Sequence, residues 1–293
     1  MDRRIRAAFA LILAISLGTL LSPQSAFAAS WVRLPSYQRW TGLTALERGQ
    51  GVATDGTYFY YSGTYSLAKA TTSGDHEVAS TVSAIPGDLS SGYGSDHIGD
   101  IDYFGGLVIA PLEDGNGYQH PLLALYDANS LAYTGRYVQL PLSTMPGGVP
   151  WVAVDAAAGL VYTAPWSQSS LPGRNQLVVY SLADLLTLPA GATLPVLRTI
   201  PLSRPLDRIQ GAAMYQGKLF ASVDISGDKS VYSIDVTSGQ VSWEFHQDVH
   251  DSDEVQGIAA FDLGPAGGQL HVLNVGSGWK SIFLYLQHYT VTG

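Results

Sequence analysis

The sequence predicts an all-β fold in which residues 29–293 form one domain, a five-bladed β-propeller. Three observations lead to this prediction. Helical periodicity is nearly absent, and short β-rich runs separated by Gly, Asp, Asn and Pro follow one another along the chain. One strand–turn–strand unit recurs five times. A segment near the N-terminus also matches strands that end earlier units, so it can supply the strand that the last unit lacks.

Each unit has a Gly or an equivalent residue, a short apolar strand, a tight turn and an aromatic-rich strand. The units follow one another at intervals of 46 to 60 residues. This spacing fits a four-stranded blade with variable loops, because a compact WD40 blade takes about 40–45 residues. A β-sandwich of similar length is the alternative, but it does not require such a repeat. The units begin at Gln50-Gly51, Ile98-Gly99, Pro150-Trp151, Gln210-Gly211 and Gln256-Gly257, and we interpret the repeated Gln as part of the blade framework.

The ring is predicted to close through the N-terminal strand. Trp31-Val32-Arg33-Leu34-Pro35 matches Tyr137-Val138-Gln139-Leu140-Pro141 and Leu197-Arg198-Thr199-Ile200-Pro201, which are expected fourth strands. The fifth unit stops after its third strand, near Tyr289 to Val291. Pairing of the first strand with the last blade would therefore remove the exposed edges.

Residues 1–28 have the three parts of a secretory signal peptide. Arg3, Arg4 and Arg6 precede an apolar run from Ala7 to Leu21, and Ala26-Phe27-Ala28 forms a small-residue cleavage site. A membrane anchor is the alternative, but the run is short for a bilayer and ends before Pro23. We therefore expect a secreted, extracellular protein of bacterial type, with no membrane span in the mature chain.

The composition narrows the possible partners. The chain carries a formal net charge of −9, and an acidic surface repels phosphate backbones, so we expect no nucleic-acid partner. The chain contains no Cys, so an exported protein of this length must be held together by its core. The 46% of hydrophobic residues supply that core.

In a four-stranded blade, the loops from strand four to the next strand one and from strand two to strand three emerge on the same face. Here these connections are long and varied, so we call this side the loop-rich face and expect function around the channel mouth there. Aromatic side chains in such loops suit sugar rings or the apolar groups of a protein partner. The candidate ligand-binding residues are Trp40, Tyr93, Tyr118, Trp166, Arg208 and Trp279.

Acidic residues and one histidine near the innermost strands are candidates for catalysis. His97 and Asp100 lead into the first strand of the second blade, and Asp253 and Glu254 precede the fifth. Together they could supply a general acid and a general base, and a solvated acidic rim is the alternative. Asp100 could also bind a calcium or sodium ion in the channel together with backbone carbonyls. Glu113-Asp114-Gly115-Asn116-Gly117 is either a fragment of a calcium loop or an Asx turn.

The first unit carries a family resemblance. Gln50 to Tyr58, followed by Ser62-Gly63-Thr64-Tyr65, resembles the opening blade of plant-type glutaminyl cyclases. The overall architecture also resembles secreted lectin propellers and arabinanase-like glycosidases. In the second blade the cyclases bring an acidic Gly-Glu-Gly, whereas this chain has Ile98-Gly99-Asp100. The resemblance implies an extracellular propeller and assigns no specific family.

Two functional hypotheses follow. The first is a lectin-like recognition or scaffold protein that binds an extracellular glycan, a cell-wall component or a protein partner on the loop-rich face. The second is an extracellular hydrolase, lyase or cyclase that uses His97 and Asp100, with Asp253 or Glu254 as partner. The first requires an aromatic-lined surface, and the second requires two titratable groups that converge in one pocket.

Overall fold

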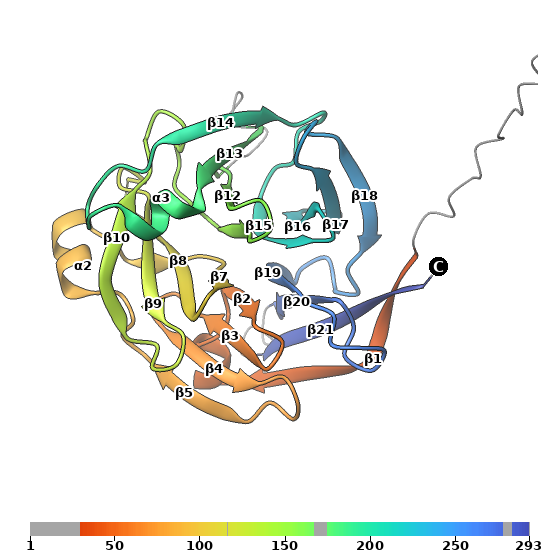
Figure 1. Cartoon of the computed structure of the whole chain (residues 1–293). Coiled ribbons are helices and arrows are strands. Elements are labelled where there is room, and N and C mark those ends of the chain that lie inside the picture. Colours follow the sequence, from red (N-terminus) through yellow and green to blue (C-terminus); the bar gives the residue numbers. More distant parts are fainter. Residues whose placement is uncertain (1–29, 116, 167–174, 278–282, 293) are drawn as a thin grey trace, which may run out of the picture.

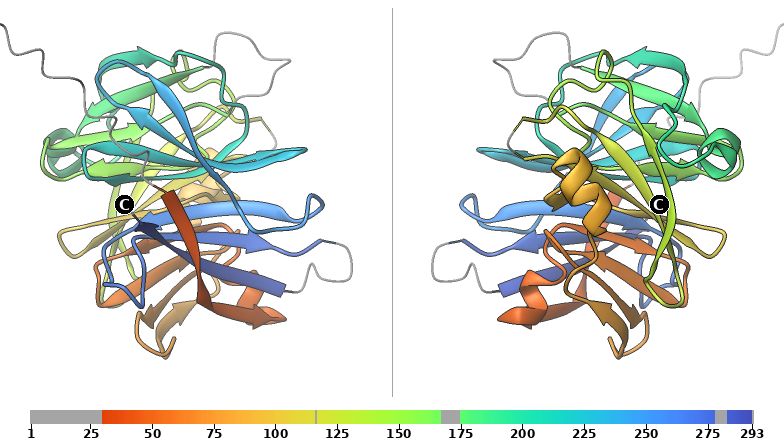
Figure 2. Two further views of the ribbon diagram at one scale, coloured as in Figure 1. Left: turned by 90° about the vertical axis from the view of Figure 1, so that its right-hand side faces the viewer. Right: turned by 90° about the vertical axis from the view of Figure 1, so that its left-hand side faces the viewer.

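The computed structural model describes residues 30–115, 117–166, 175–277 and 283–292. Its strands form five sheets arranged as blades around one axis, which confirms the five-bladed propeller (Figure 1). Figure 2 shows the blades edge-on. The predicted signal peptide and Trp279 lie outside the described residues. Within the described ranges, no helix has the length and apolar composition needed to cross a membrane.

The first and second blades follow the predicted order, with each strand antiparallel to the next. The innermost strand of the second blade is split into two short pieces, both paired with β8. The elements of this part of the ring are α1 (Leu43–Leu46), β2 (Gly51–Thr54), β3 (Tyr58–Ser62), β4 (Leu67–Thr71), β5 (Glu77–Thr81), α2 (Gly87–Tyr93), β6 (His97–Ile98), β7 (Asp102–Phe104), β8 (Leu107–Glu113), β9 (Leu122–Asp127) and β10 (Tyr133–Gln139).

The third and fourth blades are regular four-stranded sheets. The short helix α3 leaves the third strand of its blade, and its first turn is capped by the Ser181 hydroxyl, which accepts a hydrogen bond from the Asp184 N–H. The elements are β11 (Ala153–Asp155), β12 (Leu160–Thr163), β13 (Gln176–Ser181), α3 (Leu182–Thr187), β14 (Val196–Pro201), β15 (Ile209–Tyr215), β16 (Lys218–Ile225), β17 (Asp228–Asp235) and β18 (Val241–His246).

The fifth blade joins the two ends of the chain. Its sheet has the order β1-β21-β20-β19, so the N-terminal strand is its outermost strand, as predicted (Figure 1). The register shifts between Arg33 and Tyr37, around Pro35, which has no N–H to give to a ladder. The elements are β1 (Ser30–Thr41), β19 (Glu254–Ala260), β20 (Leu270–Val275) and β21 (Phe283–Thr292).

The core is divided among the contacts between neighbouring blades. Successive side chains of a strand point to opposite faces of its sheet, so each blade contributes to two interfaces. In β9, Leu122 and Ala124 pack toward the first blade, while Leu123 and Leu125 pack toward the third. Five buried clusters result, one at each blade–blade contact. This explains why the inner strands are apolar at consecutive positions rather than at alternate ones.

Candidate functional site

Asp100 belongs to the second blade and lies fully buried on the propeller axis, where it contacts all four of the remaining blades. Its carboxylate accepts hydrogen bonds from the N–H groups of Val52 (2.8 Å), Ala212 (3.1 Å) and Ile258 (3.3 Å), in the first, fourth and fifth blades. Its own N–H donates to the Pro150 carbonyl, and its carbonyl accepts from Val152, both beside the third blade. The gap between β6 and β7 frees Asp100 from its own sheet for these contacts.

The repeated glycines make room for this carboxylate. A Cβ atom built on Gly51, Gly211 or Gly257 would lie within 2.7 Å of an Asp100 carboxylate oxygen. The same atom on Gly211 would lie 2.6 Å from the Gly257 Cα, so the inner strands themselves leave no space for it. The Gly of the repeat is therefore a close-approach residue at a narrow axis.

Backbone N–H groups surround the Asp100 carboxylate, where we expected carbonyl oxygens. Burial raises the pKa of Asp100 well above its usual range, while the three N–H donors oppose that shift because they stabilise the charged form. The described residues contain no group of three His, Cys, Asp or Glu side chains placed to hold a metal ion. The hypothesis of a calcium or sodium ion in the channel stays a prediction.

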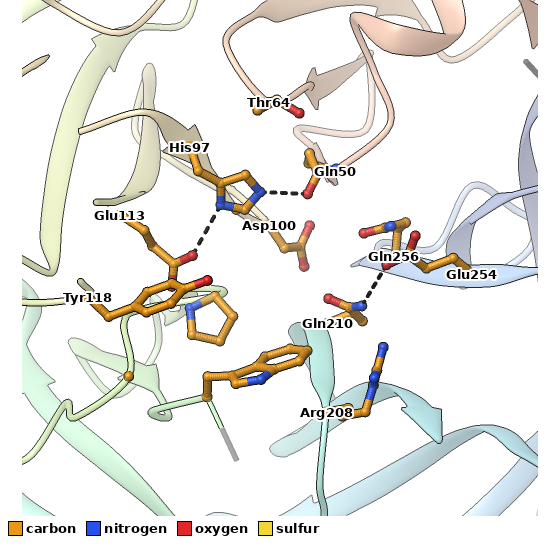
Figure 3. Close-up of a pocket in the computed structure, with 14 residues that line it drawn as sticks. Gln50, Thr64, His97, Asp100, Glu113, Tyr118, Arg208, Gln210, Glu254 and Gln256 are labelled. Atoms are coloured by element: carbon orange, nitrogen blue, oxygen red, sulfur yellow. Dashed lines mark hydrogen bonds and ion pairs between the residues drawn. The ribbon is translucent and has the colours of Figure 1, made fainter. Parts of the chain in front are cut away.

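A polar cavity of about 330 Å³ opens above Asp100. Its wall is built from connections that enter an innermost strand and from connections between second and third strands, which are the two kinds expected on the loop-rich face. We call it the channel-mouth cavity. Besides Asp100 it is lined by Gln50, Thr64, His97, Gly99, Glu113, Tyr118, Gly147, Pro150, Trp166, Arg208, Gln210, Glu254 and Gln256 (Figure 3).

His97 is held between two side chains of this cavity. Its Nδ1 lies 3.1 Å from Glu113 Oε2, and its Nε2 lies 2.8 Å from Gln50 Oε1 (Figure 3). Glu113 ends the apolar strand β8 and is almost fully buried, whereas the His97 side chain is 30% exposed. The two oxygen acceptors fix the imidazole orientation, and a histidine oriented by a carboxylate is a frequent participant in proton transfer.

The opposite wall comes from the fourth and fifth blades. The Gln210 amide donates to Glu254 Oε1 across the blade boundary, at 3.3 Å (Figure 3). Arg208 has a φ of +54°, uncommon for a residue with a side chain, and its guanidinium donates to Asp224 at 2.9 Å. The guanidinium also lies 5.7 Å from the centre of the Trp166 ring. A strained backbone and a buried carboxylate thus hold Arg208 in the cavity wall.

Tyr118 supplies the second aromatic side chain of the wall. It has a φ of +52° and is 40% exposed. Partial burial raises its pKa, and the neighbouring carboxylates of Glu113, Asp96 and Asp114 raise it further. Its hydroxyl therefore stays protonated and available as a hydrogen-bond donor or acceptor.

The structure places the predicted site residues in several locations. His97, Asp100, Tyr118, Trp166, Arg208 and Glu254 line the channel-mouth cavity. Asp253 does not; it accepts hydrogen bonds from Ser277 and from the His250 N–H in the loop before β19. Trp40 was expected to contact ligand, but it is buried, packs on Tyr61 and donates to Asp75. Tyr93 belongs to α2, where its hydroxyl pairs with that of Tyr137.

Eight residues that line the cavity are not among the predicted site residues, and they include Glu113 and the three repeated glutamines. Glu113, predicted to lie in a calcium-loop fragment or an Asx turn, instead ends the apolar strand β8, and a charged residue at the end of such a strand is a usable signal. Asp114 does form a turn, since its carboxylate accepts from the N–H groups of Gln119 and His120. The repeated Gln50, Gln210 and Gln256 were assigned to the framework, but all three line the cavity.

No protein-family model matches the chain, and no curated protein matches it. Similar solved structures include a chain of the mitotic checkpoint complex (11% identity, TM-score 0.41), covering 81% of this chain and 62% of that one. For Kuenenia stuttgartiensis hydrazine synthase (13% identity, TM-score 0.44), the match covers 78% of this chain and 56% of that one. For the WD40 β-propeller domain of Doa1 (10% identity, TM-score 0.44), the match covers 81% of this chain and 77% of that one. The chain thus spans about three fifths of the first two.

These comparisons assign no family, so the local resemblance to glutaminyl cyclases and lectin propellers stays a prediction. The five-bladed fold stands on the order and register of the strands themselves. This fold is compatible with a scaffold that binds a partner protein.

Proposed function

We propose that the chain is a secreted recognition protein that binds a glycan unit in the channel-mouth cavity. The observation that supports this is the convergence of amide, carboxylate and aromatic side chains from all five blades above an axis that Asp100 fills (Figure 3). The cavity volume lies at the lower end of the roughly 300–1,000 Å³ typical of small-molecule sites. It therefore suits one or two sugar rings rather than a long segment of polymer.

The chemistry of the wall matches a saccharide. A sugar hydroxyl both donates and accepts a hydrogen bond, and the amides of Gln50, Gln210 and Gln256 offer both functions. Glu254 adds acceptors from the fifth blade. The less polar face of a sugar ring can pack on an aromatic ring, and Trp166 supplies one. Arg208 contacts the Trp166 ring and so orients it within the wall.

The second candidate is an extracellular hydrolase, lyase or cyclase. The His97–Glu113 contact favours it, because a histidine oriented by a carboxylate is a frequent general base. Glu254 would be its partner across the cavity. Asp100 is less suited to this role than we expected, since its carboxylate is already held by three backbone N–H groups.

The test is a glycan array with the purified protein, followed by calorimetry on the ligands found. Trp166→Ala should weaken binding about thirtyfold, since loss of an aromatic anchor costs about 2 kcal/mol. Trp243→Ala is the matched control, because this exposed Trp lies on the outer strand β18 and outside the cavity. Equal affinity of both variants, or no binding to any glycan, would contradict the proposal. Turnover of a bound glycan that His97→Gln abolishes would establish the enzyme instead.

A further inference from the structure

The four most exposed large hydrophobic side chains of the described residues lie together. Leu43 is 76% exposed, Leu46 and Val82 are 67% exposed each, and Tyr65 is 56% exposed. All four line one shallow hollow. We call these four residues the apolar groove. Scattered exposed hydrophobic residues are normal, but a contiguous group marks an interaction surface.

The backbone conformation holds these four side chains toward solvent. In the single turn of α1, Ala45 is buried, while Leu43 and Leu46 stand three residues apart on the other side. The Ser66 hydroxyl donates to the Glu47 carbonyl and ties α1 to the next connection. The Tyr65 carbonyl accepts from the Ala84 N–H at 2.7 Å. The groove is therefore preorganised by hydrogen bonds rather than by packing of its own apolar groups.

Carboxylates mark both ends of the groove. Glu47 lines the hollow beside α1, and a second hollow continues past Tyr65 and Val82 to Asp96. The described residues that line the two hollows include no Lys or Arg. An apolar surface with acidic ends complements a segment with basic ends. The net charge of −9 works against a second copy of the chain, and against an anionic membrane, as the occupant.

We propose that the apolar groove binds a partner protein, through a segment that presents apolar side chains flanked by Lys or Arg. The groove is a surface separate from the glycan-binding residues. The hollow that contains the groove meets the channel-mouth cavity at Thr64, which lines both. A bound segment would therefore lie at the edge of the cavity.

The experiment selects peptides from a random 12-residue phage library on the purified protein and measures their binding by fluorescence polarisation. The selected peptides should combine apolar residues with Lys or Arg. Leu46→Ser should weaken their binding tenfold or more, and Glu47→Lys should weaken it severalfold, with the Glu47 effect lost at high salt. Leu197→Ser is the matched control, since Leu197 is 53% exposed on β14, outside the groove.

Three results would overturn the proposal. The first is a selection that yields peptides without the apolar–basic pattern, or peptides that bind Leu46→Ser and the wild type with equal affinity. The second is sedimentation that shows a self-associated species which Leu46→Ser dissociates, because the occupant is then a second copy. The third is binding to phosphatidylglycerol vesicles that Leu46→Ser abolishes. If Leu46→Ser fails to fold, each measurement is made with Val82→Ser in its place. None of these readouts involves a glycan, so the two proposals fail separately.

Discussion

Neighbouring residues of one repeat face two different environments at the centre of this propeller. Gly51, Gly211 and Gly257 pack around the Asp100 carboxylate on the axis. The residue before each of them is a Gln that lines the open cavity. The axis is filled and fully hydrogen-bonded, whereas the cavity keeps polar groups accessible. A short repeat can thus specify ring closure at one position and ligand chemistry at the next.

The largest loss of unfolding free energy is expected when the Asp100 carboxylate is removed from the axis. Asp100→Ala leaves the N–H groups of Val52, Ala212 and Ile258 without their carboxylate. An orphaned buried donor costs about 1–3 kcal/mol, so we expect roughly 3–5 kcal/mol of lost unfolding free energy in urea. Asp100→Asn, which keeps one acceptor oxygen, should lose less.

Thermal unfolding of the wild type and of Asp100→Ala tests the channel cation. If the three backbone N–H contacts account for the stabilising role of the Asp100 carboxylate, a chelator or the removal of sodium should leave the melting temperature of the wild type unchanged. A fall of the melting temperature on chelation, absent from Asp100→Ala, would show that an ion and not the amides sets the role of this carboxylate.

A somewhat smaller loss is expected from crowding the axis. Gly211→Ala would bring a methyl group to 2.3 Å from the Asp100 carboxylate and 2.6 Å from the Gly257 Cα. Overpacking costs about 1–3 kcal/mol, and both neighbours are fixed, so we expect about 3 kcal/mol by urea unfolding. Gly92→Ala is the control, because nothing lies within 4 Å of its Cβ position in α2. Equal effects of the two changes would refute the close-approach role.

The repeat allowed the fold to be predicted but not the site. Within a blade, strands that follow one another in the sequence pair, so the glycine spacing suffices to predict the blades. The closing strand is distant in sequence, and the match of Trp31 to Pro35 with later fourth strands predicts its place. The site forms between blades. Spacing along the chain does not reveal that Asp100 meets amides of three other blades, or that His97 meets Gln50 of the first blade. Trp40 was misplaced for the same reason, because its burial depends on contact with the first blade.

The smallest effect concerns the two buried histidines of the fifth blade. His271 and His288 are buried in the fifth blade, where their Nδ1 atoms lie 2.7 Å apart and both rings contact Phe59 of the first blade. Burial lowers the pKa of His271 to about 3 and that of His288 to about 4, from an ordinary value of 6.5. Both are therefore neutral in the folded protein at neutral pH.

The sign of the pH dependence follows from these lowered pKa values. Below pH 6.5 the unfolded chain binds protons that the folded chain does not, so stability is full above pH 6.5 and falls as the pH drops toward 4. Between pH 7 and 5.5 the loss should be about 2 kcal/mol for the pair, measured by urea unfolding. His288→Gln should remove about half of this loss, and His271→Gln should act in the same direction. An acid limb that both variants leave intact would show that the buried pair does not set the acid stability.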